Sequence, residues 1–323
     1  MPYRNLAVEK ILMNRTAPGE CVLYLWQNRN TVVIGRNQDA WEECRVECLR
    51  AEGGYLARRY SGGGAVYHDV GNLNFSFLMR REDEDPVRQT EVILRAVRAL
   101  GIPTERTGRN DLETHGRKFS GHAWFKTGDL YCHHGTLMMN VDLGRMNRYL
   151  TAAPAKLRSR NVQSVRSRVM NLSEIRPDIN RSGLTAELIR AFEEVYGLRA
   201  ESMTIPTEAE AAISRETEKM ASEAWLFPPG MSRATRTEAR FSWGGICLET
   251  LVDRGTVLDA VCRSDAMDEE LIREIGKALP GCAWNEAALA ERLQGLNGSG
   301  DMAPEERERK KRIIEDVIGM LRI

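Results

Sequence analysis

A run of three glycines at positions 62–64 constrains this chain more than any other feature of its sequence. The segment from Arg58 to Val70 reads RRYSGGGAVYHDV. Consecutive glycines weaken a helix or strand, and they occur where the backbone bends sharply or lies against a ligand. The alternating apolar residues that follow predict a short strand, and the two arginines before the glycines favour an anionic ligand. The segment therefore predicts a site for a nucleotide phosphate or a carboxylate.

The two commonest nucleotide-binding motifs are absent from the sequence. There is no Gly-x-x-x-x-Gly-Lys-Ser/Thr, so the chain is not a P-loop protein. No Gly-x-Gly-x-x-Gly opens an early strand–helix–strand unit, which argues against a dinucleotide fold. The glycine run must therefore serve another geometry.

A second group of polar residues lies in the segments 108–111 and 116–121, which read GRND and GRKFSG. The ammonium group of Lys118 is a compact point charge that can bridge phosphate and carboxylate oxygens. Asp111 is a candidate ligand for Mg²⁺, which prefers one or two carboxylates together with substrate phosphates. Alone, Lys118 would be read as an exposed charge on a polar hairpin, but beside the glycine run we favour a binding site.

Two adjacent histidines, His133 and His134, precede Gly135. On a strand they point to opposite faces, so they do not readily share a metal ion. Cys132 gives no zinc-finger spacing with them. We expect a hydrogen-bonding role in a strand that lines the site, with a purely structural role as an equal alternative.

The segment Ser164–Leu172 contains two arginines, Arg166 and Arg168, which share one face of an extended chain. It is interpreted either as a loop that closes over an anionic intermediate or as a basic surface loop. The residues alone do not decide between the two.

Composition excludes several classes of protein. Lys and Arg total 46 and Asp and Glu total 46, so the zero net charge argues against a general nucleic-acid binder. No apolar run is long enough for a membrane span. The N-terminal residues lack the apolar stretch of a secretory signal. Seven scattered cysteines suit free thiols in a reducing compartment, so we expect a cytoplasmic protein.

Periodicity and turn signals predict a mixed order of helices and strands. The segments Cys21–Gln27 and Thr31–Gly35 are expected to form a hairpin. Turn residues at 228–233 indicate a linker to a smaller domain, in which a hairpin around 253–255 precedes three helices. The other expected elements are helices at Trp41–Ala51, at 86–100 after the N-cap Asp85, at Ser182–Tyr196 and after a capping box at Thr207–Glu210, and strands at Tyr55–Arg59, Ala65–His68, Asn74–Met79, Arg117–Lys126 and Gly135–Asp142.

Taken together, these motifs resemble lipoate–protein ligase A. The run Arg58–Phe77, the segments 108–121, His133–Leu137 and Ser164–Leu172 follow the order and spacing of that family, and Phe241–Gly245 resembles the start of its accessory domain. The resemblance covers nearly the whole chain.

The resemblance implies an α+β fold. It consists of a mixed-sheet catalytic domain of the biotin/lipoate ligase type at 1–234 and a small α+β accessory domain at 235–323. It also implies an ATP-dependent and Mg²⁺-dependent ligase, which converts lipoate to lipoyl-AMP and transfers the lipoyl group to a lysine of an apo lipoyl domain. The acceptors of the family are the lipoyl domains of 2-oxoacid dehydrogenase complexes and the glycine cleavage H protein. Octanoate is an alternative substrate. We expect a monomer that binds neither nucleic acid nor a membrane.

Matching residues give each candidate a role. Lys118 is the catalytic residue, and Asp111 is the candidate magnesium ligand. The adenylate-binding loop contains Ser164, Arg166 and Arg168. The expected ATP- and lipoate-binding residues are Arg59, Gly62, Gly63, Gly64, Ala65, Val66, Tyr67, Lys118, His134 and Gly135.

Two alternatives remain open at this point. An octanoyl- or lipoyltransferase of the same fold would act without ATP, and the forms that use an acyl-enzyme need a cysteine nucleophile, of which the sequence offers no convincing one. A non-catalytic lipoate-binding protein would bind lipoate without modifying an acceptor. Arg59, Lys118 and Asp111 argue against the second alternative.

Overall fold

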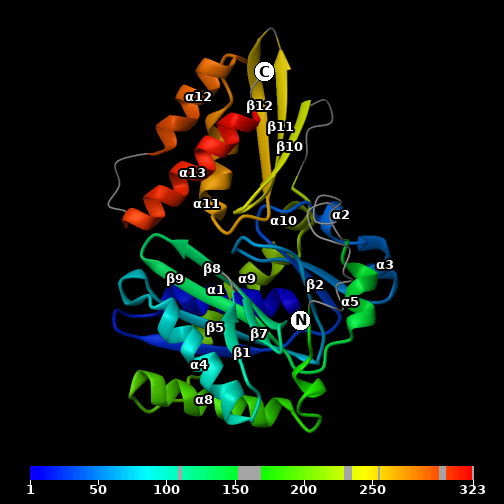
Figure 1. Ribbon diagram of the computed structural model, residues 1–323, viewed down its shortest axis with the longest axis vertical. Helices are drawn as coiled ribbons and strands as arrows, with labels where there is room; N and C mark the ends of the chain where they lie inside the picture. Colours follow the sequence, from blue (N-terminus) through cyan, green and yellow to red (C-terminus); the bar gives the residue numbers. More distant parts are fainter. Residues whose placement is uncertain (108–110, 152–168, 229–234, 254, 298–302, 322–323) are drawn as a thin grey trace. The chain divides into compact units, whose positions relative to one another are not determined.

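The computed structural model describes every residue except 108–110, 152–168, 229–234, 254, 298–302 and 322–323. The described residues form two compact units (Figure 1). The first consists of Met1–Ile34, Ala40–Arg59 and Ala65–Leu226, and the second of Gly35–Asp39, Tyr60–Gly64 and Phe227–Ile323. The expected domain boundary after residue 234 adjoins an undescribed segment, so it stays a prediction.

A six-stranded sheet, here called the larger sheet, lies at the centre of the first unit. Its strands lie in the order β1-β5-β9-β8-β7-β6, and all neighbours are antiparallel. The strands are β1 (Cys21–Trp26), β5 (Asn72–Arg80), β9 (Leu130–Met138), β8 (Arg117–Thr127), β7 (Asp111–Thr114) and β6 (Glu105–Thr107). Strand β9 begins and ends earlier than the strand expected at Gly135–Asp142, and Asp142 instead caps helix α5 (Leu143–Tyr149).

A second, three-stranded sheet is mixed. Strand β2 (Thr31–Ile34) pairs in parallel with β3 (Tyr55–Arg58) and antiparallel with β4 (Val66–His68). The hairpin expected between the first two apolar segments is therefore wrong, since β1 pairs with β5 in the larger sheet. All four residues of β2 are buried, and buried backbone N–H and C=O groups need hydrogen-bond partners. The strands on both sides of β2 provide them, and β2 is the central strand of this sheet.

Helices α4 (Pro86–Ala99) and α8 (Arg181–Tyr196) cover one face of the larger sheet. Their apolar stripes form the main core with side chains such as Phe75 and Phe77 of β5. The predicted signals at both helices are confirmed: Asp85 caps α4 by accepting a hydrogen bond from a backbone N–H, and Gly197 ends α8 in the left-handed region.

Helix α1 (Pro2–Arg15) packs against the opposite face of the larger sheet, and α9 (Glu210–Ala221) lies beside it (Figure 1). The capping box expected at Thr207–Glu210 does not form. A 3-10 turn at Thr207–Ala209 leads into α9 without a side-chain cap.

The single helix expected at Trp41–Ala51 is broken into α2 (Ala40–Glu43) and α3 (Val46–Ala51). The break coincides with an isolated bridge between Cys44 and Leu150, and Arg45 N donates to Tyr149 O at 2.8 Å. The remaining helical elements of this unit are α5 (Leu143–Tyr149), α10 (Glu223–Leu226) and the 3-10 turns Arg81–Asp83 and Leu172–Glu174.

The second unit has a three-stranded antiparallel sheet and a separate apolar core. The predicted hairpin is confirmed, because β11 pairs with β12 up to Asp253 and Thr256. Strand β10, which was not expected, adds to the other edge of β11. The elements are β10 (Thr235–Phe241), β11 (Gly244–Asp253), β12 (Thr256–Ser264), α11 (Glu269–Ala278), α12 (Glu286–Gln294), a 3-10 turn Gly295–Asn297 and α13 (Pro304–Met320).

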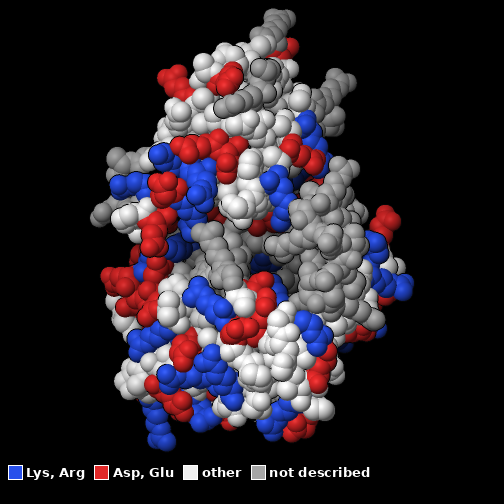
Figure 2. All heavy atoms as spheres, viewed as in Figure 1, with Lys and Arg blue, Asp and Glu red and all other residues white. Residues whose placement is uncertain are grey.

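Charge is distributed without a large patch of one sign on the face shown in Figure 2, where basic and acidic side chains alternate. This agrees with the equal numbers of basic and acidic residues in the sequence. Within the described part of the chain, no helix combines the length and the apolar character needed to cross a membrane.

Replacing Glu269 by glutamine is expected to stabilise the second unit near neutral pH. This carboxyl lies in the first turn of α11, and burial raises its pKa to about 8, against 4.5 for an unperturbed glutamate. Between these values the unfolded chain has lost the proton that the folded chain keeps. The free energy of unfolding therefore falls as pH rises through this window.

The glutamine variant lacks this titration, so its advantage should grow to about 1–3 kcal/mol by pH 8. Thermal unfolding curves of both proteins at pH 5 and pH 8 test the expectation. Equal pH slopes in the two proteins would show that Glu269 titrates normally in the folded state.

Candidate active site

The face of the larger sheet that packs against α1 carries a buried group of polar side chains. Glu9 of α1 accepts hydrogen bonds from Ser76 Oγ at 2.5 Å and from His134 Nδ1 at 2.8 Å. Trp26 Nε1 donates to Ser76 Oγ at 3.0 Å. Burial opposes ionisation of Glu9, but His134 and Ser76 outweigh it and hold its pKa below the ordinary value. A carboxylate anion is therefore kept inside the unit.

Arg59 brings a cation into the same interior. Its side chain is almost fully buried, and Nη1 donates to Val33 O at 3.2 Å. Burial lowers its pKa to about 10, while the negative charges of Glu9 and Glu43 oppose the shift. The guanidinium therefore remains protonated at neutral pH and interacts electrostatically with the buried carboxylate of Glu9.

The neighbouring Arg58 has a different environment. It is 1% exposed, and its donors reach two backbone carbonyls at the end of α10: Nε to Trp225 O at 3.0 Å and Nη2 to Leu226 O at 2.6 Å. In return, Trp225 Nε1 donates to Arg58 O at 3.0 Å. Both arginines thus donate to backbone carbonyls, Arg58 at the end of α10 and Arg59 at Val33 of β2.

Lys118 lies on a β-bulge. Opposite β7, Leu112 pairs with Ser120 while Glu113 pairs with Lys118, so β8 contributes one extra residue, Phe119. A bulge interrupts the strict alternation of side chains and re-aims them locally. Phe119 is fully buried in the core beneath α4 and α8, and Lys118 is turned to the other side.

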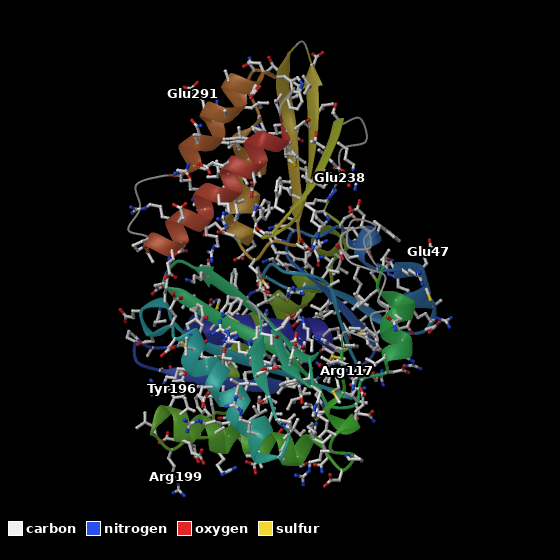
Figure 3. The ribbon with its side chains drawn as sticks, in the orientation of Figure 1. Glu47, Arg117, Tyr196, Arg199, Glu238 and Glu291 are labelled. Atoms are coloured by element: carbon white, nitrogen blue, oxygen red, sulfur yellow. The ribbon has the colours of Figure 1, made fainter. Side chains whose placement is uncertain are left out.

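The Lys118 ammonium lies between Asp111 and the backbone of Gly121. Its Nζ forms an ion pair with Asp111 Oδ1 at 2.7 Å, and both side chains are a little over one third exposed. A Cβ at Gly121 would lie 2.9 Å from this Nζ, so a larger residue at this position would displace the end of the lysine side chain. The preceding residue, Arg117, which is labelled in Figure 3, is ion-paired with Glu174 at 2.9 Å.

Gly135 and its neighbours confirm the expected alternation on β9. His134 faces Glu9 of α1, and His133 faces Gln89 of α4 on the other side of the sheet. A Cβ at Gly135 would lie 2.5 Å from Phe75 Cζ, so this glycine is required by close packing within the sheet.

The glycine run belongs to the second unit and approaches backbone there. A Cβ on Gly62 would lie 2.2 Å from Ala266 O, and Gly63 N donates to the same oxygen at 3.1 Å. Gly63 has a φ of 86°, which favours glycine, and a Cβ on Gly35 would lie 2.2 Å from its carbonyl oxygen. Gly64 completes the run within this unit. Close approach to the protein's own backbone thus explains glycine at position 62, and the positive φ explains glycine at position 63.

The residues after the run return to the first unit. Ala65 leads into β4, which begins at Val66. Tyr67 is buried, and its hydroxyl donates to Asn30 Oδ1 at 3.2 Å. Burial raises the pKa of Tyr67 to about 12, so its hydroxyl stays protonated.

The expected adenylate-binding residues Ser164, Arg166 and Arg168 lie outside the described residues. The residues that follow them are anchored directly at the Lys118 backbone. Met170 N donates to Lys118 O at 2.8 Å, and an isolated parallel bridge joins Val169 to Lys118.

Within the described part of the chain, one group of side chains has metal-ligand spacing: the ligand atoms of Glu9, Cys132 and His134 lie within 4.8 Å of one another. Glu9 already accepts hydrogen bonds from His134 in this group and from Ser76 outside it, so we interpret the group as a satisfied polar cluster.

Sequence reasoning missed several of these residues. Glu9 was not singled out because nothing near it in the sequence marks a site, and its partners come from strands more than 60 residues away. The available signal was the alternation of polar residues in β5, where Asn72, Asn74 and Ser76 share one face of a buried strand.

Comparison with known proteins agrees with this arrangement. Residues 1–193 match the lipoyl protein ligase A/B catalytic domain, and residues 233–312 match the bacterial lipoate protein ligase C-terminus. A lipoate–protein ligase A of Psychrobacter cryohalolentis is 37% identical over 92% of this chain and 90% of its own length. The chain belongs to the lipoate–protein ligase A family. A ligase of the same name from Bdellovibrio bacteriovorus is 35% identical over the same shares.

Solved structures support the fold of this lipoate–protein ligase. P. falciparum LipL1 in complex with lipoate superposes with a TM-score of 0.83 at 24% identity, covering 98% of this chain and 96% of its own. A lipoate–protein ligase A bound with ATP has a TM-score of 0.63 at 25% identity and covers 70% of this chain and 94% of its own. The expected α+β architecture of the biotin/lipoate ligase type is thereby confirmed.

Proposed function

We propose that this lipoate–protein ligase works in two steps on the α1-facing side of the larger sheet. In the first, the carboxylate of lipoate attacks the α-phosphorus of ATP, which forms lipoyl-AMP and releases pyrophosphate. In the second, the ε-amine of an acceptor lysine attacks the acyl carbon, loses a proton and releases AMP. Octanoate is proposed as an alternative acyl substrate. The ATP-bound and lipoate-bound relatives support this choice of substrates.

The observation that carries the proposal is the placement of Lys118. Lipoate and ATP are both anionic, so their reaction needs a cation that neutralises charge where it develops. The Lys118 ammonium lies next to Gly121, which carries no side chain, and the lysine side chain is a little over one third exposed, so substrate oxygen atoms can approach it. We assign Lys118 the stabilisation of the α-phosphate in the first step and of the acyl oxygen in the second, without a covalent bond to substrate.

The other binding residues are proposed from their positions in the motifs. Arg59 supplies a buried cation for the substrate carboxylate or phosphate. The remaining proposed contacts with nucleotide, lipoate and adenylate are Gly62, Gly63, Gly64, Ala65, Val66, Tyr67, His134, Gly135, Ser164, Arg166 and Arg168.

Mg²⁺ is the proposed metal partner of ATP. This ion usually binds one or two protein carboxylates together with phosphate oxygens, and Asp111 provides one carboxylate beside Lys118. The residues present therefore fit the ion. When bound, Mg²⁺ would neutralise phosphate charge. Lys118, which is ion-paired with Asp111 in the described structure, would then bind the substrates instead.

The proposed acceptors are the lipoyl domains of 2-oxoacid dehydrogenase complexes and the glycine cleavage H protein. A bi-partite lipoate protein ligase from Thermoplasma acidophilum, solved as a system with its E2 lipoyl domain, supports this class; it is 26% identical with a TM-score of 0.64. We further propose that the enzyme acts as a cytoplasmic monomer and binds neither nucleic acid nor membrane.

The alternative of an ATP-independent transferase with an acyl-cysteine is less well supported. A thiol nucleophile needs a lowered pKa. Burial raises the pKa of Cys21 to about 11 and that of Cys44 to about 12, which disfavours the thiolate at both positions.

Two assays on the full-length protein test the proposed function. Lipoate-dependent exchange of labelled pyrophosphate into ATP, without acceptor, should report the first step. Incubation with ATP, Mg²⁺, lipoate and an apo lipoyl domain should add one lipoyl group to the acceptor by mass. Transfer from an acylated carrier protein in the absence of ATP, with no exchange, would favour the transferase instead.

A further inference from the structure

A hydrogen-bonded chain of four buried side chains crosses the interior between α4 and β8. Ser120 Oγ lies 3.0 Å from His122 Nε2, His122 Nδ1 lies 2.8 Å from His133 Nε2, and His133 Nδ1 lies 2.8 Å from Gln89 Oε1. Ser120, His133 and Gln89 are inaccessible to solvent, and His122 is 6% exposed. The two-step reaction proposed above uses none of these four side chains.

In this row of four side chains, every hydrogen bond is donated in the same direction, from Ser120 toward Gln89. Burial lowers the pKa of His122 to about 3 and that of His133 well below its ordinary value, so both rings are neutral and each carries one N–H. The carbonyl of Gln89 can only accept, so His133 donates to it and accepts from His122. His122 Nε2 in turn accepts from the hydroxyl of Ser120. Both ring nitrogens of His122 and of His133 are thereby hydrogen-bonded.

One end of this chain lies at the bulge. Ser120 directly follows the extra residue Phe119, and Lys118 directly precedes it. The extra residue of a bulge has no partner in the ladder, so the ladder alone fixes the local geometry poorly. The other end is Gln89, on the second turn of α4, whose side chain also donates to Met79 Sδ at 3.2 Å.

We propose that Ser120, His122, His133 and Gln89 are positioning residues for Lys118. Their hydrogen bonds fix Ser120 against the core, which keeps Phe119 buried and turns the Lys118 ammonium toward Gly121 and Asp111. The inference rests on the proposed role of Lys118 in lipoyl-AMP formation. It adds a set of residues, remote from the reacting atoms, on which the rate of that step depends.

The test compares three variants of the full-length enzyme. Ser120→Ala removes the donor at the near end, and Gln89→Leu removes the acceptor at the far end. Trp124→Phe is the matched control: Trp124 lies on the same strand and stacks on His133 with ring centroids 5.1 Å apart, but its indole N–H has no hydrogen-bond partner in the described structure.

Two quantities are measured besides thermal stability. The first is kcat and KM for lipoyl-AMP formation. The second is the rate at which an amine-reactive acylating reagent labels Lys118, read by peptide mass spectrometry. Lys126 of the same strand serves as internal reference, since it is ion-paired with Glu84 at 2.9 Å and has a similar exposed fraction.

We expect Ser120→Ala and Gln89→Leu to lower kcat roughly tenfold to a hundredfold with little change in KM, because a small displacement of a charged group weakens the transition state more than the bound substrate. Labelling of Lys118 relative to Lys126 should rise severalfold, and Trp124→Phe should change neither quantity.

The proposal is overturned if both variants match Trp124→Phe in kcat and in labelling, or if Ser120→Ala alone has an effect, since the chain then does not act as a unit. If labelling of Lys118 rises as expected but not even the unmodified enzyme forms lipoyl-AMP, the positioning of Lys118 is supported and the proposed reaction fails.

Discussion

Replacing Lys118 by alanine is expected to lower the rate of lipoyl-AMP formation by roughly a thousandfold. The side chain is a little over one third exposed and forms an ion pair through its ammonium group, so its loss removes the cation from the site without opening a cavity in a core. We therefore expect a folded variant in which the rate of lipoyl-AMP formation is strongly reduced. Lipoate-dependent pyrophosphate exchange gives the rate, and circular dichroism with a melting curve reports the fold.

Lys126→Ala is a closely matched control. It removes a lysine of similar exposure from the same strand, and that lysine also forms an ion pair, with Glu84. It should leave the exchange rate within about twofold of the unmodified enzyme, as expected for a surface ion pair worth little. Near-normal lipoyl-AMP synthesis in Lys118→Ala would remove this residue from the mechanism.

The second large effect concerns the free energy of unfolding, which should fall by about 3 kcal/mol when Arg58 is replaced by methionine. Methionine has a similar length but no donors. Two carbonyls at the end of α10, those of Trp225 and Leu226, would lose the charged hydrogen bonds that Arg58 now provides in a buried setting. Urea unfolding of the variant, monitored by circular dichroism, measures the loss.

Arg59→Met separates stability from binding in the same motif. Arg59 is the arginine that we place at the substrates, so this variant should raise KM for ATP or lipoate. The folded fraction of Arg58→Met should keep the KM values of the unmodified enzyme. Raised KM in Arg58→Met with unchanged stability would mean that the two roles have been assigned to the wrong arginines.

Local signals predicted the elements that depend on local physics. Asp85 before a proline and Gly197 after an apolar stripe mark helix ends because capping is settled within one turn of the backbone. The opposite orientation of His133 and His134 follows from the two-residue period of a strand and needs no tertiary information.

What the sequence did not predict depends on contacts between distant segments. The first two apolar strands looked like a hairpin, but each has its partners elsewhere, because pairing is decided by what else the sheet can bury. The residue types of Arg58 and Arg59 do not distinguish them, and only the resemblance favoured Arg59. The backbone partners of Arg58 lie in α10, more than 160 residues later in the sequence, so its structural role was not predicted.

The extra residue at position 119 has a consequence for how the motif varies between related proteins. On an unbroken strand, residues three apart point to opposite faces, so Lys118 and Gly121 meet only because the alternation is interrupted once between them. A relative that kept this spacing but lost the interruption would turn its lysine into the apolar layer beneath α4. In a relative that lacked one residue between the lysine and the glycine, the two would be two apart, and they would share a face only if the strand had no bulge. The number of residues between the lysine and the glycine must therefore change together with the presence of the bulge. Insertions and deletions are harder to accept here than substitutions.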